Sequence, residues 1–160
     1  MDPLLPREGN VFMDSPVVSI PQSLDLCRSA TAKENVATAR IDELSIWRSK
    51  IRFDKEQQES AIHWLQTLGF KAAEKQIFQL SGGEQQRVAL ARLLNSKRKI
   101  WLLDEPVSQL DDQAAFECLA VAKSEAKKRN ATVLCVLHQE KIAQALADRV
   151  FHWDEKWRLS

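Results

Sequence analysis

The sequence predicts an α/β protein in which a parallel sheet is joined to a mainly helical segment. Two apolar runs, Ile100–Leu103 and Ala131–Leu137, are separated by a stretch rich in helix formers, and strands that alternate with helices form parallel sheets. Residues 31–95 carry helical signals, and 160 residues allow one ordinary domain. We therefore expect one α/β domain whose ligands lie at the carboxyl ends of the strands.

The N-terminal part predicts little regular structure before one short strand. Prolines and a glycine recur up to Pro16, which favours an irregular segment or at most an edge strand over residues 1–15. Val17–Ile20 is rich in β-branched residues, and Pro21 has no N–H to continue a ladder. We expect a strand that ends at Gln22.

Three helices are expected next. Residues 32–40 are rich in helix formers, and Lys55–Leu68 places its apolar side chains on one face before Gly69, which is typical of a helix stop. The third helix fits Gly83–Asn95, where apolar residues again form a stripe.

The second half of the chain alternates strands with helices. Ile100–Leu103 has the continuous apolar form of a strand buried on both faces, and Ala131–Leu137 is a second apolar strand. Helices are expected at 114–129 and 141–147, and Arg149–Trp153 is a last possible strand.

Composition excludes several classes of protein. The 23 Lys and Arg residues against 22 Asp and Glu leave a net charge of +1, which provides no global field for nucleic acid or an anionic membrane. No apolar run approaches the roughly 18 residues of a membrane span, and no signal peptide is recognised. The three cysteines are too far apart for a C-x-x-C site. We expect a protein of a reducing compartment that binds no nucleic acid.

Polar side chains follow the three expected strands. Gln22 follows the first, Asp104 and Glu105 the second, and His138 the third. A carboxylate at such an edge can hold Mg²⁺ while its neighbour orients or deprotonates an attacking water. The alternatives are an edge-strand glutamine, a solvated acidic turn and a solvent-facing histidine.

A glycine pair precedes the third expected helix. In Leu80–Arg87 (LSGGEQQR), a serine and two glycines stand where the first N–H groups of a helix are free. Free N–H groups at the positive end of a helix dipole can bind an anion such as phosphate. The alternative is an ordinary N-capped helix after a glycine-rich turn.

Taken together, these segments resemble the ATP-binding cassette (ABC) ATPases, in the same order and at similar spacing. His138 after ATVLCVL is similar to the family's switch histidine. The other matches are LSGGEQQRVALAR at 80–92 with the signature motif, KIWLLDEP at 99–106 with the Walker B strand, SQLD at 108–111 with the D-loop, and VVSIPQS at 17–23 with the Q-loop.

The resemblance implies an incomplete P-loop NTPase core with a helical signature subdomain, in a single partial ABC ATPase domain over 1–160. Its parts would be a Q-loop strand region at 1–22, a helical subdomain at 23–95, and a core at 96–160 with the Walker B, D-loop and H-loop motifs.

The resemblance also implies ATP and Mg²⁺ as cofactors. Glu105 would be the general base, and His138 would contact the γ-phosphate. Asp104 would bind Mg²⁺ through water, and Gln22 would sense both the Mg²⁺ and the attacking water.

Cassettes of this family work as head-to-tail dimers, so the resemblance implies a second ABC ATPase subunit as partner. The signature residues Ser81, Gly82, Gly83 and Glu84 would lie against ATP held by that subunit, with Ser81 and Gly83 closing over its γ-phosphate. Asp111 would bridge the interface.

Within the family, several segments look most like phosphonate-import ATPases, among them Glu34–Ala37 and Ile46–Ser49. Such a subunit would dock on membrane permease subunits through residues 23–95. It would lie in the cytoplasm, peripheral to the inner face of the cell membrane.

One family motif is missing from these residues. The four glycines include no pair that could form the phosphate loop G-x-x-x-x-G-K-[ST], called Walker A. We therefore expect hydrolysis to be impaired without a partner. Because the Walker A strand of the family lies beside the strand that precedes His138, we also expect an uncovered apolar sheet face, with Arg149–Trp153 either unpaired or paired with Ala131–Leu137.

The main functional hypothesis is the energy-coupling ATPase subunit of an ABC importer. Two alternatives stay open at this point. The chain could be a non-catalytic partner, regulator or inactive remnant that pairs with an intact cassette, or it could be a non-transport member of the family.

Overall fold

The computed structural model describes residues 16–40, 53–152 and 158–159. The segment 1–15 and the Ile46–Ser49 match therefore lie outside the described residues. The elements are β1 (Val17–Ile20), α1 (Ala32–Ala37), η1 (Thr38–Arg40), α2 (Lys55–Thr67), η3 (Ile77–Gln79), α3 (Gly82–Asn95), β2 (Ile100–Asp104), α4 (Asp112–Arg129), β3 (Thr132–Val136), α5 (Glu140–Leu146), β4 (Phe151–His152) and β5 (Arg158–Leu159).

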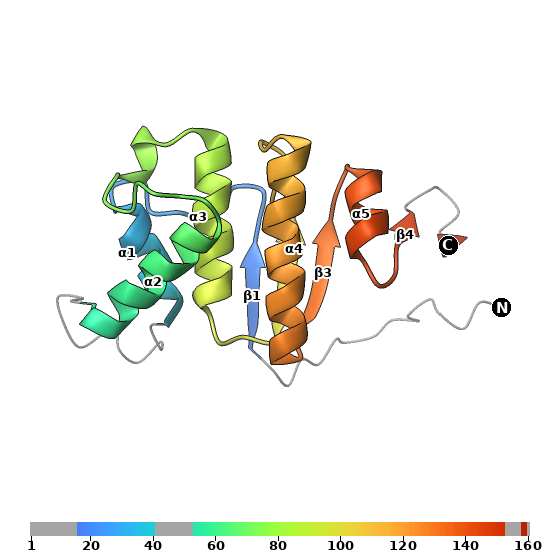
Figure 1. Ribbon diagram of the computed structural model, residues 1–160, viewed down its shortest axis with the longest axis horizontal. Helices are drawn as coiled ribbons and strands as arrows, with labels where there is room; N and C mark the ends of the chain where they lie inside the picture. The colour runs from blue at the N-terminus through green and yellow to red at the C-terminus, as the bar shows by residue number, and fades with distance from the viewer. Residues whose placement is uncertain (1–15, 41–52, 153–157, 160) are drawn as a thin grey trace, which may run out of the picture.

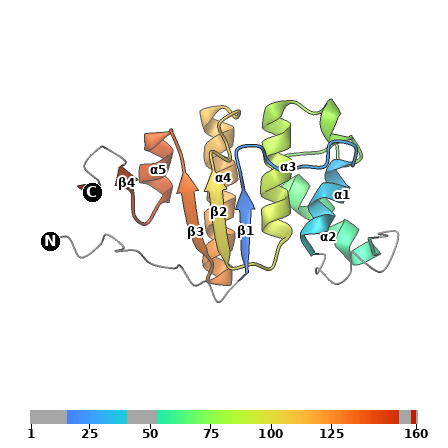
Figure 2. The ribbon, with the colours of Figure 1, turned by 180° about the vertical axis from the view of Figure 1, so that it is seen from behind.

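The three strands predicted at 17–20, 100–103 and 131–137 form one parallel sheet in the order β1-β2-β3. Val18 pairs with Trp101, which pairs with Val133 on the other side. Helix α4 lies over one face of the sheet, in front of it in Figure 1 and behind it in Figure 2. Because the strands are parallel, their carboxyl ends share one edge, which confirms the predicted α/β fold class.

Most helix boundaries lie within two residues of the predicted ones, and side-chain caps explain the differences. Helix α3 begins at Gly82 because Ser81 caps it, and α4 begins at Asp112 because the Asp111 carboxylate accepts the Ala114 N–H at 2.9 Å. Gly69, with a φ of 73°, follows the end of α2 as predicted. Residues 38–40 leave the α-helix and form the 3₁₀ turn η1.

The sheet is covered on one face only. Trp101 is fully buried beneath α4, whereas Leu134 is 62% and Val136 52% exposed on the opposite face. The prediction that Ile100–Leu103 is buried on both faces is therefore wrong, because no described helix covers the second face (Figure 2). The expected uncovered apolar face is present.

This uncovered face is expected to make the 160-residue chain self-associate at micromolar concentration. Replacing Leu134 and Val136 together by threonine should shift the chain toward monomer, because threonine keeps the strand preference and removes apolar area. Sedimentation velocity measures the shift. Phe78→Thr is the control, since Phe78 is 55% exposed but lies away from the sheet. A wild-type chain that stays monomeric would contradict the expectation.

The last predicted strand does not join the main sheet. Phe151–His152 pairs antiparallel with Arg158–Leu159 in a separate two-stranded sheet. The expectation that Arg149–Trp153 is unpaired or paired with Ala131–Leu137 is therefore wrong, because a strand that follows it supplies the partner.

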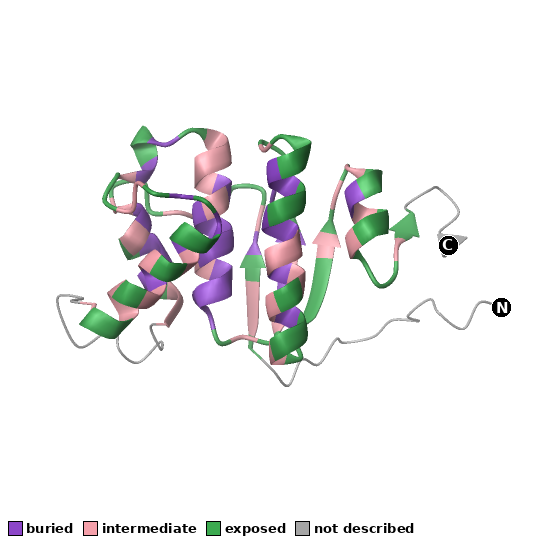
Figure 3. Ribbon diagram, in the orientation of Figure 1, coloured by how far each residue is buried: buried purple, intermediate pink, exposed green. Residues whose placement is uncertain are grey.

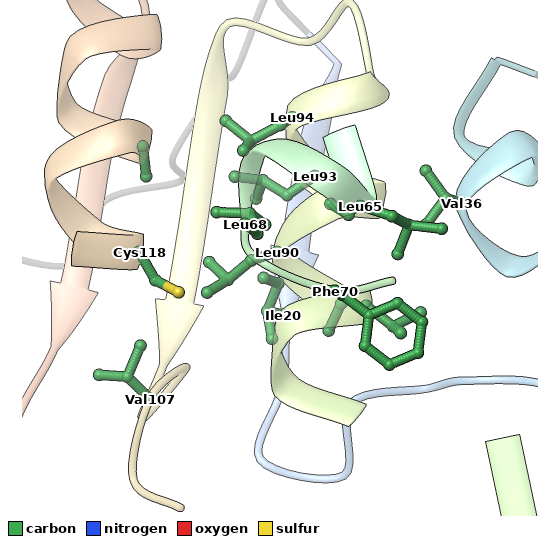
Figure 4. Close-up of a cluster of buried hydrophobic side chains, with 14 of the residues drawn as sticks. Ile20, Val36, Leu65, Leu68, Phe70, Leu90, Leu93, Leu94, Val107 and Cys118 are labelled. Atoms are coloured by element: carbon green, nitrogen blue, oxygen red, sulfur yellow. The ribbon is translucent and has the colours of Figure 1, made fainter. Parts of the chain in front are cut away.

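Helix α3 lies at the centre of the hydrophobic core. Buried residues run along most of its length (Figure 3), and it packs against α1, α2, α4 and β1. Its apolar side chains meet those of the neighbouring elements in one cluster (Figure 4). No helix within the described ranges is long and apolar enough to span a membrane.

Candidate functional site

Glu105 and His138 meet at the carboxyl edge of the sheet. They follow the adjacent strands β2 and β3, and His138 Nε2 lies 2.6 Å from Glu105 Oε1. The Glu105 N–H donates to the Val136 carbonyl at 3.1 Å, which fixes the backbone beside the pair. Glu105 has a φ of 48°, a left-handed conformation that is strained for a residue with a side chain. Two of the three predicted catalytic side chains, Glu105 and His138, are therefore in contact, and the third, Gln22, is not part of this contact.

Asp104 lies at the same edge, as the last residue of β2, and is exposed. Among the residues that the structure describes, none donates a hydrogen bond to its carboxylate or forms an ion pair with it. Burial is the main cause that raises the pKa of Cys135 to about 12, and the negative charge of Asp104 adds to it. Cys135 is thus a neutral thiol at this edge. The carboxylate of Asp104 has no partner among the described residues and is available to a ligand.

Gln22 lies in the turn after β1, exposed at the same edge. No hydrogen bond joins it to Asp104, Glu105 or His138 within the described part of the chain. The predicted edge residues thus separate into a contacting pair, Glu105 and His138, and two side chains that are unpaired.

The donor set at this edge fits Mg²⁺. Magnesium keeps several waters and binds proteins through one or two carboxylates together with phosphate oxygens. In residues 16–40 and 53–152, no cluster of three or more His, Cys, Asp or Glu side chains could hold a metal ion. An exposed carboxylate at Asp104 suits an ion that waters and phosphate oxygens also coordinate, and not a site that the protein encloses alone.

The turn after Gln22 is held by a residue that sequence reasoning missed. Leu24 and Asp25 have positive φ values of 61° and 45°. Arg92 of α3 donates to the Leu24 carbonyl at 2.8 Å and to the Asp25 carbonyl at 2.6 Å. Burial lowers the pKa of Arg92, yet the guanidinium remains a strong donor. No sequence signal other than an arginine in the last turn of α3 marks this contact.

The start of α3 is a capping box. The Ser81 hydroxyl accepts the Glu84 N–H at 3.3 Å, and the Glu84 carboxylate accepts the Ser81 N–H at 2.8 Å. The latter bond is the main cause that lowers the pKa of Glu84 below its ordinary value of 4.5. The structure therefore shows an N-capped helix here, which was the alternative interpretation of this segment.

The cap leaves two backbone N–H groups at the start of α3 without an acceptor in the part of the chain that the structure describes. Within the described residues, the N–H groups of Gly82 and Gly83 have no acceptor, and Ser81 is exposed. Free N–H groups at a helix start are the donors that a phosphate requires. The anion-binding interpretation therefore depends on these two N–H groups.

The glycine pair also gives the following loop room to approach the helix. A Cβ atom on Gly82 would collide with the side-chain amide of Gln109, and one on Gly83 would lie 2.8 Å from the Gln109 carbonyl oxygen. Asp111, at the end of this loop, is exposed and caps α4. Gly83 is therefore required by its packing against the loop, independently of any ligand.

The two glycines are expected to differ in their response to alanine. Gly83→Ala should lower the free energy of unfolding by about 1–3 kcal/mol, because its methyl group meets a backbone carbonyl. Gly82→Ala should cost less, because the Gln109 side chain can rotate away. Urea unfolding of both variants measures the difference, and a Gly83→Ala variant as stable as Gly82→Ala would contradict it.

Comparisons with known proteins identify the family of the chain. The model of the ABC transporter family matches residues 6–108. The hypophosphite import ATP-binding protein HtxD of Stutzerimonas stutzeri is 40% identical, over 81% of this chain and 38% of its own. The phosphonates import ATP-binding protein PhnC of Frankia casuarinae is 37% identical, over 81% and 52%. The glutamate transport ATP-binding protein GluA of Corynebacterium glutamicum is 39% identical, over 92% and 59%.

Solved structures show the same fold. The dimeric structure of MJ0796, a bacterial ABC transporter cassette, matches with a TM-score of 0.67 and 29% identity, over 79% of this chain and 53% of its own. Its post-hydrolysis dimer bound to ADP and phosphate matches with a TM-score of 0.74 and 26% identity, over 91% and 63%.

The chain spans about half the length of the curated relatives it matches. The matched family model covers more than half of the chain itself, and the fold is that of the ABC cassette P-loop NTPases. The chain belongs to the ABC transporter family and matches part of its ATPase domain.

Proposed function

We propose that this chain serves in the ATP-binding subunit of an ABC importer, where it takes part in the binding and hydrolysis of ATP with Mg²⁺. The observation that carries the proposal is the contact of 2.6 Å between His138 and Glu105 beside a free Asp104 carboxylate. The relatives supply the importer class, since three of them are named as import or transport ATP-binding proteins.

The edge of the sheet would carry the chemistry. Glu105 accepts the proton of the attacking water as the oxygen of that water bonds to the γ-phosphorus and the bridging β,γ-oxygen leaves. His138 holds the Glu105 carboxylate in place and reaches the γ-phosphate. Asp104 and Gln22 would hold Mg²⁺, which would supply positive charge to the phosphate oxygens.

The start of α3 would serve the ATP held by a second subunit. Gly82 and Gly83 present two free N–H groups, while Glu84 accepts hydrogen bonds from the Ser81 N–H and the Ser81 hydroxyl and so fixes the residue before them. Asp111 lies on the loop against these glycines and would bridge to the partner. No G-x-x-x-x-G-K-[ST] loop occurs in these 160 residues, so the phosphate loop of each site must lie outside them.

A complementation assay tests the signature residues. The chain is mixed with the complete cassette of a phosphonate importer whose own signature serine is replaced by arginine, so that two copies of that cassette form no working site. Hydrolysis is expected to appear on mixing, and Ser81→Arg should return it to the level of the partner alone. Ser124→Arg, on an exposed position of α4, is the control. Equal rates with Ser81→Arg and wild type would contradict the proposal.

A second candidate is a non-catalytic role in which the chain only completes the partner's site. No phosphate loop occurs in these 160 residues, and in this role the partner would supply it. Negligible ATP binding by the chain alone, together with hydrolysis restored on mixing, would support this pairing role. On either proposal, residues 23–95 dock on the permease at the inner face of the membrane.

A further inference from the structure

Gln86 is a buried polar side chain that joins α3 to the loop after β2. It is 2% exposed and lies in the second turn of α3. Its Nε2 donates to Ser108 Oγ at 2.9 Å and, in a longer contact of 3.4 Å, to the Glu105 carbonyl. Its Oε1 accepts the Gln109 N–H at 2.9 Å. One side chain therefore bonds to three residues of the loop, Glu105, Ser108 and Gln109.

These bonds reach the strained residue of the site. Glu105 is left-handed, and its carbonyl accepts both Gln86 Nε2 and the Ser108 N–H, at 3.4 and 3.3 Å. A strained backbone persists only when its surroundings determine it. The carbonyl held by Gln86 belongs to the same residue whose carboxylate meets His138, so the two contacts are joined through one residue.

A buried amide of this kind is costly unless all its groups are paired. Gln86 satisfies its acceptor and its donors on the loop alone, and an apolar side chain of similar size would fill the same space. The amide of Gln86 therefore serves to bind the loop, and the core around α3 does not need a polar side chain at this position.

We propose that Gln86 is a positioning residue that sets the orientation of Glu105 toward His138 from the signature helix. The relevance of this link to hydrolysis rests on the proposed function. Gln86 touches none of the reacting atoms and acts through Glu105 and the loop at 105–111.

Nuclear magnetic resonance of the full chain tests the link. The His138 ring nitrogen resonances are measured in wild type, in Glu105→Gln as the reference for a lost carboxylate partner, and in Gln86→Met. Gln86→Met should move the His138 Nε2 resonance at least half of the way to the reference. The Gln109 amide should exchange with solvent about fivefold faster or more, because it loses its acceptor.

Gln85→Met is the matched control. Gln85 is the neighbouring glutamine of α3, and among the described residues its Nε2 donates to the Leu80 and Ile77 carbonyls alone, at 3.0 and 3.4 Å. Its replacement should leave both the His138 resonance and the Gln109 exchange unchanged. A merely structural role of Gln86 would speed amide exchange along all of α3 and leave His138 in place.

Gln86→Glu separates the bonds made by the amide nitrogen of Gln86 from the bond made by its oxygen. This variant also replaces Gln86→Met if Gln86→Met does not fold. Its carboxylate keeps an acceptor for the Gln109 N–H and lacks the donors to Glu105 and Ser108. The His138 resonance should move while Gln109 stays protected. An unmoved His138 resonance in Gln86→Glu overturns the inference. Failure of the complementation assay would contradict the proposed function and leave this measurement standing.

Discussion

Replacing Glu105 by glutamine is expected to lower the rate of ATP hydrolysis by about a hundredfold or more and to leave ATP binding intact. The glutamine amide has the same shape, and its oxygen can still lie near His138 Nε2, which is 2.6 Å from Glu105 Oε1 in the wild type. It cannot accept a proton from water at neutral pH. The change therefore removes the proposed base and keeps the structure around it.

The measurement requires a phosphate loop in the same polypeptide as Glu105, so that both belong to one ATP site. We would join the phosphate-loop segment of a phosphonate import relative ahead of residue 16 and compare steady-state hydrolysis with the dissociation constant for MgATP. Glu140→Gln is the control, because Glu140 is an exposed glutamate two residues after His138. A rate within twofold of wild type for Glu105→Gln would exclude Glu105 as the base.

The parallel sheet was predictable because its strands carry local signals. The apolar runs at 100–103 and 131–137 are followed by polar residues, and the parallel register brings those residues to one edge. Burial was not predictable in the same way. An apolar strand is the same in sequence whether a helix covers one face or two, so the exposure of Leu134 could not be derived from its neighbours alone.

The candidate site was predictable where a motif names the residue. Glu105 and His138 were expected at one edge, and the structure places them in contact. Arg92 and Gln86 were not expected, because glutamine and arginine on a helix are ordinary surface residues in a sequence. Their partners are backbone groups of Leu24 and Glu105 in left-handed conformations, and no pattern of side chains marks such conformations.

Replacing Leu90 by alanine is expected to lower the free energy of unfolding by about 2–5 kcal/mol. Leu90 is fully buried on α3, near the centre of the labelled side chains in Figure 4. The substitution would leave a cavity between the sheet and the helical segment, and the surrounding side chains could not fill it unless α3 moved. The loss is a large part of the roughly 5–15 kcal/mol that stabilises an ordinary domain.

Chemical denaturation of Leu90→Ala beside Leu134→Ala measures this effect with the same atoms deleted in both. Leu134 is 62% exposed on the uncovered face, so its loss should cost less than about 1 kcal/mol. Because α3 also carries Ser81, Gln86 and Arg92, Leu90→Ala should loosen the signature cap and the turn after Gln22 together. Equal costs for the two leucines would mean that α3 is not the element on which the sheet edge and the signature motif depend.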